Sequence, residues 1–258
     1  MSLGTVRFLG TGTSHGVPMI GCRCDVCRSA DPRDRRLRPS IYMALADGMR
    51  VLVDTTPDLR TQALAHDIDR VDAILFTHCH ADHVMGLDEV RRFNILQGAA
   101  VPCYGDAPTM AEVRRTFAYI FEAADEGGGI PQISLNTVEG PFAIGAQAVV
   151  PVPVVHGRRL ILGYRVGGFA YLTDCSAIPD GSWLLLEGLD TLVIDALRHR
   201  PHRSHFTVEG ALAAIARIAP RRALLTHVCH ELAHEATSAM LPPGVELAYD
   251  GLALEIGD

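Results

Sequence analysis

Residues 77–83 have the sequence Thr77-His78-Cys79-His80-Ala81-Asp82-His83 and follow the apolar run 71–76, which predicts a buried strand. Three imidazoles and a carboxylate in this stretch are ligands that zinc, iron or manganese accepts. At an extended strand end, His78 and His80 project to the same side and can share one ion. Beyond the turn, Asp82 and His83 suit a second ion close to the first, with a water between the two. A single histidine here would be best explained as an ordinary polar loop residue, but four potential ligands in a row after a buried strand are better explained as a metal site.

Three other predicted strands each lead into a further potential ligand. These are residues 151–155 before His156, 169–172 before Asp174, and 223–225 before His227. Strand ends are rigid, so side chains gathered there from distant parts of the chain can form a metal site. Taken one at a time, each residue is equally well explained as a capping carboxylate or a surface histidine. Together with residues 77–83 they supply the donors for two ions.

Composition limits the class of protein. With 258 residues, 48% of them hydrophobic, the chain has enough apolar material for one large domain, residues 1–258. The formal net charge of −7 and a pI of about 5.9 provide no overall basic field for long nucleic acids or anionic membranes. No apolar run approaches the roughly 20 residues that span a bilayer, and the N-terminus has no secretory signal pattern. We therefore expect a cytoplasmic protein with no membrane partner and no stable nucleic-acid partner.

The cysteines suggest a second kind of metal site. Seven cysteines are an odd number, and three of them, Cys22, Cys24 and Cys27, lie within six residues. This spacing favours metal thiolates over disulfides in a reducing compartment. Tetrahedral zinc takes four donors, so a fourth ligand must come from elsewhere in the chain. The sequence thus predicts a zinc-binding loop around residues 21–40.

The order of predicted elements indicates the fold class. Strands are expected at 6–9, 41–46, 49–53, 71–76, 99–104, 133–136, 142–144, 147–155, 160–166, 169–172, 191–194 and 223–225, with a final β segment at 247–256. Helices are expected at 57–66, 85–93, 108–119, 177–187 and 207–218, and an edge loop or lid at 122–131. Two facing mixed sheets with helices outside, an α+β fold of four αβ/βα layers, satisfy this order.

The quoted motifs resemble the metallo-β-lactamase superfamily, whose hallmark is H-x-H-x-D-H. The matching runs are T-H-C-H-A-D-H, H-G-R at His156, T-D-C at Asp174 and L-T-H-V-C-H at His227. The C-x-C-x-x-C triplet and a second histidine three places after His227 are similar to the PhnP-like subfamily, typified by phosphoribosyl 1,2-cyclic phosphate phosphodiesterase. The resemblance covers nearly the whole chain and implies the four-layer metallo-β-lactamase sandwich.

The resemblance also implies roles for individual residues. His78, His80 and His156 would hold one ion, Asp82, His83 and His227 the other, and Asp174 would bridge the two. The implied cofactors are two divalent catalytic ions, manganese or zinc with iron as an alternative, and a bridging hydroxide would be the nucleophile. His205 matches the subfamily's general acid, and Asp82 is expected to serve catalysis as well as metal binding. The alternative for His205 is an exposed position at a helix N-terminus.

The subfamily pattern makes His230 the fourth ligand of a structural zinc with Cys22, Cys24 and Cys27. On a helical turn, His227 and His230 would lie close together, one facing the catalytic ions and the other the structural one. Cys229 is the competing candidate, because it would complete a site of four cysteines. Such a zinc would attach the N-terminal loop to the floor of the active site.

Several other residues have expected roles near the site. Arg198 and Arg203 are expected to bind a phosphate of the substrate, because guanidinium groups match phosphate oxygens. The arginines of residues 28–38 are a competing candidate, although a solvated charged loop explains them better. Asp54 and Asp195 end predicted strands and are expected to orient ligand histidines. His15, in a glycine-rich turn, is expected to border the cleft.

The function expected from these features is that of a binuclear metal-dependent phosphodiesterase acting on a small cyclic or diester phosphate. Alternatives within the superfamily are a tRNA 3′-processing endonuclease and a glyoxalase-type thioesterase or lactonase. A metal-stabilised interaction domain without catalysis is the non-enzyme alternative. The sequence leaves open the catalytic metals, the physiological substrate, and whether the protein is a monomer or a homodimer.

Overall fold

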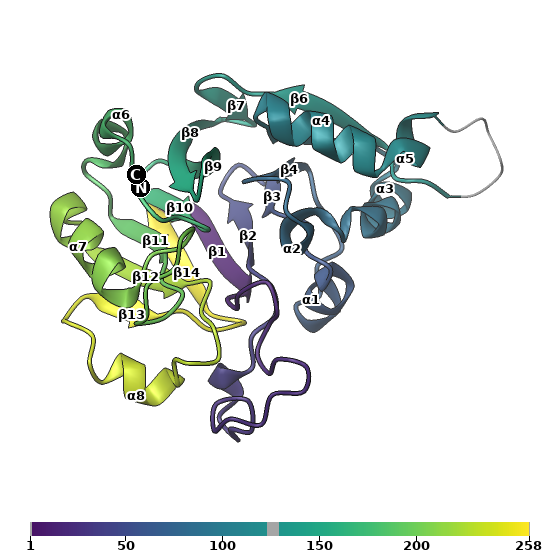
Figure 1. Cartoon of the computed structure of the whole chain (residues 1–258). Helices are drawn as coiled ribbons and strands as arrows, with labels where there is room; N and C mark the ends of the chain where they lie inside the picture. The colour runs from purple at the N-terminus through teal and green to yellow at the C-terminus, as the bar shows by residue number, and fades with distance from the viewer. Residues whose placement is uncertain (1, 123–128, 258) are drawn as a thin grey trace.

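A computed structural model describes residues 2–122 and 129–257 of the chain (Figure 1). Residues 123–128 lie outside the described part, and with them most of the edge loop or lid predicted at 122–131. The described chain forms two seven-stranded sheets, and each contains both antiparallel and parallel strand pairs.

The first sheet has the strand order β14-β1-β2-β3-β4-β5-β6. Its strands are β1 (Ser2–Gly10), β2 (Ser40–Leu45), β3 (Arg50–Val53), β4 (Ala73–Leu75), β5 (Val101–Gly105), β6 (Ile133–Thr137) and β14 (Ala253–Gly257). Strands β14, β1, β2 and β3 pair antiparallel, whereas β3 to β6 pair in parallel. Parallel neighbours need crossover connections, and the helices between these strands provide them.

The second sheet has the order β13-β12-β11-β10-β9-β8-β7. Its strands are β7 (Phe142–Ile144), β8 (Gln147–His156), β9 (Arg159–Val166), β10 (Phe169–Leu172), β11 (Thr191–Asp195), β12 (Arg222–Thr226) and β13 (Val245–Leu247). Here β7 to β10 form an antiparallel meander, and β10 to β13 are parallel. Each of the two sheets thus combines an antiparallel half with a parallel half.

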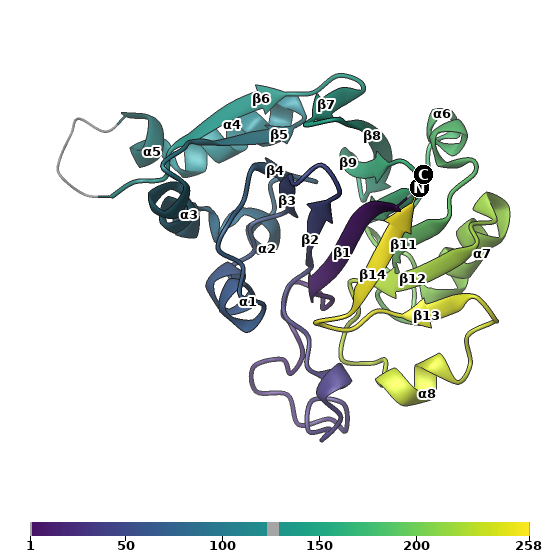
Figure 2. The ribbon, with the colours of Figure 1, turned by 180° about the vertical axis from the view of Figure 1, so that it is seen from behind.

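The helices lie outside the two sheets. They are α1 (Leu59–Ala65), α2 (Ala81–Val84), α3 (Val90–Gln97), α4 (Ala107–Thr116), α5 (Ala118–Glu122), α6 (Asp180–Trp183), α7 (Val208–Ile218) and α8 (His234–Ser238), with 3-10 turns at Pro32–Asp34, Leu87–Glu89 and Leu184–Leu186. Figures 1 and 2 show α1 to α5 on the side of the first sheet and α6 and α7 on the side of the second. Among the described residues, no helix has the length and apolar character that crossing a membrane requires.

Three apolar cores lie between these layers. The central core, between the sheets, contains Phe8 and Leu75 from the first sheet and Tyr164 and Val193 from the second. One outer core lies under α1, α3 and α4, and another lies under α7. Helix, sheet, sheet and helix therefore follow one another, which confirms the predicted four-layer αβ/βα sandwich.

Two predicted elements are wrong in a way that affects the site. The helix expected at 85–93 is interrupted, because Gly86 N donates to the Thr55 carbonyl at 2.9 Å instead of to the preceding turn. This close approach requires glycine, since a Cβ would lie only 1.9 Å from the Thr56 carbonyl oxygen. The chain instead forms the short helix α2, which carries Asp82 and His83, and then a separate α3. The β segment expected at 247–256 divides into β13 and β14 in different sheets, turning at Gly251 with a φ of +90°.

Other differences concern helix ends. The helix expected at 177–187 is reduced to α6 and a 3-10 turn, because the Ala177 carbonyl accepts a hydrogen bond from Val155 N and extends the second sheet. The helix expected at 108–119 divides at Phe117 into α4 and α5. Helix α8 is not predicted from the sequence. Thr207 is the N-cap of α7, as expected, and its side chain accepts from Gly210 N at 3.0 Å.

The central core predicts a stability difference between two leucines. Leu75 is completely buried between the sheets, so Leu75→Ala should lower the free energy of unfolding by about 2–5 kcal/mol. Leu64 is 64% exposed, and Leu64→Ala should change the same quantity by less than about 0.5 kcal/mol. Urea denaturation of metal-loaded protein measures both. Equal losses in the two variants would contradict the assignment of the central core.

Candidate metal centre

Ends of strands from both sheets meet at one edge of the sandwich. Residues 77–83 follow β4 of the first sheet, whereas His156, Asp174 and His227 lie at or just beyond the ends of β8, β10 and β12 of the second. Two hydrogen bonds attach the end of β4 to the second sheet: the Tyr164 hydroxyl donates to the Phe76 carbonyl at 2.7 Å, and Leu162 N donates to the Thr77 carbonyl at 3.0 Å. The sequence-distant ligand candidates therefore face one another.

One group of donors consists of His78, His80, His156 and Asp174, whose ligand atoms all lie within 4.8 Å of one another. His156 Nε2 is 3.3 Å from His80 Nδ1. Asp174 Oδ2 lies 3.8 Å from His78 Nε2 and 3.9 Å from His156 Nε2. These distances are too long for strong direct ion pairs and suit four donors around one cation.

The other group of donors consists of His83, His227 and the same Asp174. Asp174 Oδ1 is 3.2 Å from His83 Nε2 and 3.0 Å from His227 Nδ1. Asp82 adds a carboxylate, with its Oδ2 3.3 Å from His83 Nε2. Asp174 thus presents one oxygen to each group, which is the arrangement of a carboxylate shared by two ions.

Unpaired buried polar atoms also indicate that these residues fit a pair of cations. Among the described residues, four buried polar atoms of this centre have no hydrogen-bond partner: His78 Nε2, His83 Nε2, His227 Nε2 and Asp82 Oδ2. A buried polar atom without a partner is costly, so such atoms at one place need an explanation. Divalent cations coordinated by imidazole nitrogens and carboxylate oxygens provide it.

Hydrogen bonds on the far side of the rings orient two of the histidines. His83 Nδ1 donates to Asp54 Oδ2 at 2.7 Å, and Asp54 is held by the Thr77 N–H and hydroxyl, both at 2.8 Å. His156 Nδ1 donates to the Ser204 carbonyl at 2.9 Å. In each ring the Nε2 lone pair therefore points into the centre.

The backbone at the centre is unusual at three positions. Asp54, Asp174 and His227 have φ values of 63°, 54° and 61°, in the left-handed region that residues other than glycine rarely adopt. Each of these residues directly follows a strand or lies within two residues of its end. The sharp turn after the strand directs the side chain toward the centre, and clustering of strained positions at one place is typical of functional sites.

The pKa values at the centre shift in different directions from one side chain to the next. Burial raises the pKa of Asp174, but His227 and His83 outweigh this effect and hold that pKa well below its ordinary value. Burial lowers the pKa of His83, whereas the nearby carboxylates of Asp174, Asp82 and Asp54 raise it well above the ordinary value. Burial, followed by the charge of His83, holds the pKa of His78 well below its ordinary value. An ionised Asp174 and a neutral His78 are in the protonation states that metal binding needs, whereas His83 would release its proton when an ion binds.

His205 lies beside the centre and is 8% exposed. Its ring centroid is 4.9 Å from that of His156 and 4.7 Å from that of His227. His205 Nδ1 donates to Asp195 Oδ2 at 2.7 Å. Asp195 therefore orients His205, whereas the sequence predicts that it orients one of the metal-ligand candidates. Burial lowers the pKa of His205.

A separate group of four residues contains Cys22, Cys24, Cys27 and His230. His230 Nδ1 is 3.2 Å from Cys22 Sγ and 3.4 Å from Cys24 Sγ. The competing candidate, Cys229, turns its sulfur to the backbone, where it accepts from Glu231 N at 3.4 Å. Of the two fourth ligands considered, the structure thus places His230 with the three cysteines.

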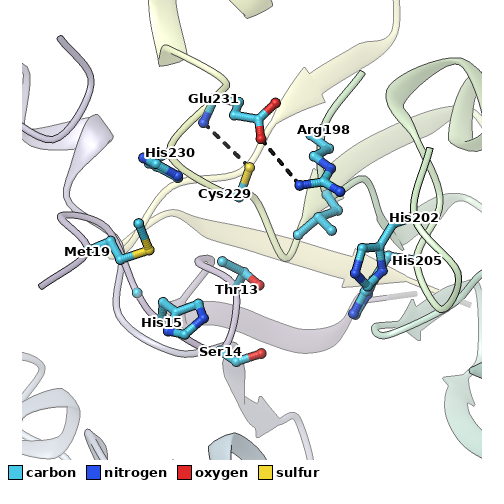
Figure 3. Close-up of a pocket in the computed structure, with 12 residues that line it drawn as sticks. Thr13, Ser14, His15, Met19, Arg198, His202, His205, Cys229, His230 and Glu231 are labelled. Carbon is cyan, nitrogen blue, oxygen red and sulfur yellow. Dashed lines mark hydrogen bonds and ion pairs between the residues drawn. The ribbon is translucent and has the colours of Figure 1, made fainter. Parts of the chain in front are cut away.

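A cavity of about 300 Å³ lies between the cysteine group and His205 (Figure 3). Its lining consists of Thr13, Ser14, His15, Gly16, Met19, Leu197, Arg198, His202, His205, Cys229, His230 and Glu231. His15 and Arg198 border it as expected, whereas the exposed Arg203 is not part of the lining.

The arginines of residues 28–38 have other surroundings. Arg33 pairs with Asp31 and Arg38 with Asp58, while Arg36 is buried and donates to the Thr11 hydroxyl. None of these arginines lines the cavity beside His205.

Three contributors to the site were missed in the sequence. The Ser204 carbonyl is a backbone atom and has no sequence signal. Thr77 and Glu231 are common polar residues, and only their contacts with Asp54 and Arg198 reveal a role. Their nearness to ligand candidates in the sequence was the sole available hint.

Residues 49–228 match the family model described as "Beta-lactamase superfamily domain". The chain belongs to this superfamily. A crystal structure described as a new diphosphatase from the PhnP family is 45% identical, with a TM-score of 0.92 and 98% of both chains covered. This similarity confirms the PhnP-like resemblance seen in the sequence. The structure of Zn²⁺-bound PqqB from Methylobacterium extorquens, 21% identical with a TM-score of 0.79 over 98% of this chain and 100% of that one, shares the fold.

One curated relative is about twice as long as the present chain. A Porphyromonas gingivalis protein named octanoyltransferase is 39% identical over 249 residues, covering 95% of this chain and 50% of that protein. The chain therefore spans about half the length of this relative. The chain therefore combines membership of this superfamily with two His/Asp groups that could each hold a metal ion.

Removing the charge behind His83 tests the orientation of the centre. Asp54→Asn should lower the affinity for one catalytic ion about 10- to 100-fold, because His83 loses the acceptor that directs Nε2 inward. Competition with a metal chelator measures this affinity. Asp72→Asn is the matched control, since Asp72 also accepts a backbone N–H but lies away from the centre, and it should leave the affinity unchanged. Wild-type affinity in Asp54→Asn would contradict the assigned role.

Proposed function

We propose that the protein is a binuclear metal-dependent phosphodiesterase that hydrolyses a small cyclic or diester phosphate. The observation that carries the proposal is Asp174, which offers one oxygen to each of two histidine groups beside the buried His205. Similarity to the PhnP-family diphosphatase structure supports phosphate as the reacting group.

The residues around Asp174 divide the metal binding between them. His78, His80 and His156 would hold one ion, and Asp82, His83 and His227 the other, with manganese, zinc or iron as the candidate metals. Two such ions supply an activated water as nucleophile and neutralise charge on the phosphoryl oxygens. The chain itself therefore needs no serine or cysteine nucleophile, and its other residues serve to position substrate and to move protons.

His205 is the proposed general acid. Its Nδ1 is committed to Asp195, so Nε2 is the nitrogen that can give a proton to the departing oxygen. Asp195 is completely buried and fixes both the tautomer and the direction of the ring. Arg198, on the cavity next to His205, is the proposed contact for an anionic part of the substrate.

A substrate panel tests the reaction class. The alternative reactions use the same metal ligands, so the test compares substrates rather than ligand variants. Metal-loaded protein should hydrolyse bis(p-nitrophenyl) phosphate and small cyclic phosphates faster than thioesters or lactones. An octanoyl thioester belongs in the panel because of the name of the Porphyromonas gingivalis relative. Turnover of thioesters without turnover of phosphodiesters would overturn the proposal.

His205→Gln tests the general acid. The variant should reduce kcat about 10²- to 10⁴-fold for a diester with an alkyl leaving group, since this oxygen needs a proton to depart. For a p-nitrophenyl leaving group, which departs as a stable anion, the loss should be much smaller. His199→Gln is the matched control, because His199 lies on the same segment but pairs with Glu209 at the surface. Equal losses for both leaving groups would contradict a proton-donating role.

The cysteine group is proposed to bind one structural zinc. Three thiolates and one imidazole are a complete tetrahedral donor set, which leaves no open position for catalysis. Cys24→Ser should therefore reduce the zinc content by about one equivalent, while the catalytic pair remains. Elemental analysis after dialysis measures this content. An unchanged zinc count would contradict the proposed site.

A further inference from the structure

Glu231 contacts two arginines at the cavity beside His205. It pairs with Arg200 through two hydrogen bonds, of 2.6 and 3.0 Å, and its Oε1 accepts from Arg198 at 3.3 Å. One carboxylate thus faces two guanidinium groups, which leaves one positive charge in excess. We call Arg198, Arg200 and Glu231 the Glu231 cluster.

Arg198 is the member of the Glu231 cluster that reaches the cavity together with Glu231 (Figure 3). Its remaining contacts are with uncharged carbonyl oxygens of its own loop, 3.2 Å to Arg200 and 3.4 Å to Pro201. Glu231 is therefore the only charged partner of Arg198 among the described residues. Without Glu231, only the two carbonyl contacts within the loop would hold the Arg198 guanidinium, and no charged group in the described part of the chain would direct it to the cavity.

The chain directly ahead of Glu231 belongs to both metal sites. His227 lies in the catalytic centre, His230 lies in the cysteine group, and Glu231 follows at once. Backbone hydrogen bonds join this turn to two other walls of the cavity: Thr13 N donates to the Val228 carbonyl at 3.1 Å, and Cys229 N donates to the Leu197 carbonyl at 3.1 Å. The position of Glu231 therefore depends on the turn that His230 anchors.

We infer that Glu231 is a positioning residue, which holds Arg198 at the cavity for an anionic substrate group and is itself held by the cysteine group through His230. The inference rests on the proposed function, because Arg198 affects hydrolysis only if the substrate enters this cavity. The proposed structural zinc would then also affect substrate affinity.

Binding of inorganic diphosphate to metal-loaded protein, measured by calorimetry, tests the inference. Glu231→Gln and Arg198→Met should each raise the Kd about five- to tenfold, the range expected for one charge-assisted contact. The double variant should bind no more weakly than Arg198→Met alone, because Glu231 acts through Arg198. Additive losses would overturn the positioning role.

Turnover separates positioning from catalysis. With bis(p-nitrophenyl) phosphate, Glu231→Gln should keep the kcat and metal content of the wild type. Asp190→Asn is the matched control, since Asp190 forms a similar surface pair with Arg221 outside the cavity, and it should leave Kd and kcat unchanged. A large fall in kcat for Glu231→Gln would overturn the inference.

The link to the cysteine group needs its own variants. Cys24→Ser, or His230→Asn if the former does not fold, should weaken diphosphate binding about as much as Glu231→Gln. Wild-type affinity after loss of this zinc would overturn the link. Calorimetry requires no turnover. If the wild type hydrolyses no phosphodiester but the variants weaken diphosphate binding as predicted, the proposed function is contradicted and the inference is supported.

Discussion

The carboxylate of Asp174 is the point on which the two halves of the molecule depend. It is buried, it follows a strand of the second sheet, and its two oxygens face histidines from both sheets. A buried anion needs compensating positive charge, and here the surrounding imidazoles leave nitrogen atoms without partners. Two cations would satisfy the anion and the nitrogens together, which suits the centre to metal binding rather than to a network of direct ion pairs.

The second metal group links the N-terminal part of the chain to its C-terminal part. Cys22 to Cys27 follow β1, and His230 lies more than 200 positions later, three residues after a ligand candidate of the catalytic centre. Figures 1 and 2 both show the loop after β1 beside α8. The buried Arg36 strengthens this junction, with contacts to Thr11 and His234. One face of the cavity is thus made by segments that a zinc would hold together.

Much of the fold was predictable because the strands are strongly apolar and the histidine motifs follow them directly. The errors arose where a local pattern met a tertiary contact. At Gly86 a hydrogen bond to the Thr55 carbonyl interrupts a helix whose apolar spacing is otherwise regular, and at Gly251 the chain turns from one sheet to the other. Arg203 has the same residue type and neighbourhood as Arg198, yet it is exposed and outside the cavity lining.

The sequence by itself determined the ligand types, their spacing and the order of strands and helices, because these depend on side-chain chemistry and local periodicity. The resemblance already implied that Asp174 bridges the two groups. Only the tertiary structure decided which of its oxygens faces which histidine, that Asp195 orients His205, and that Glu231 contacts Arg198. Such pairings join residues that are distant in the chain or that differ only in direction. They follow from how the two sheets pack and how the backbone turns at the strand ends, which no short stretch of sequence specifies.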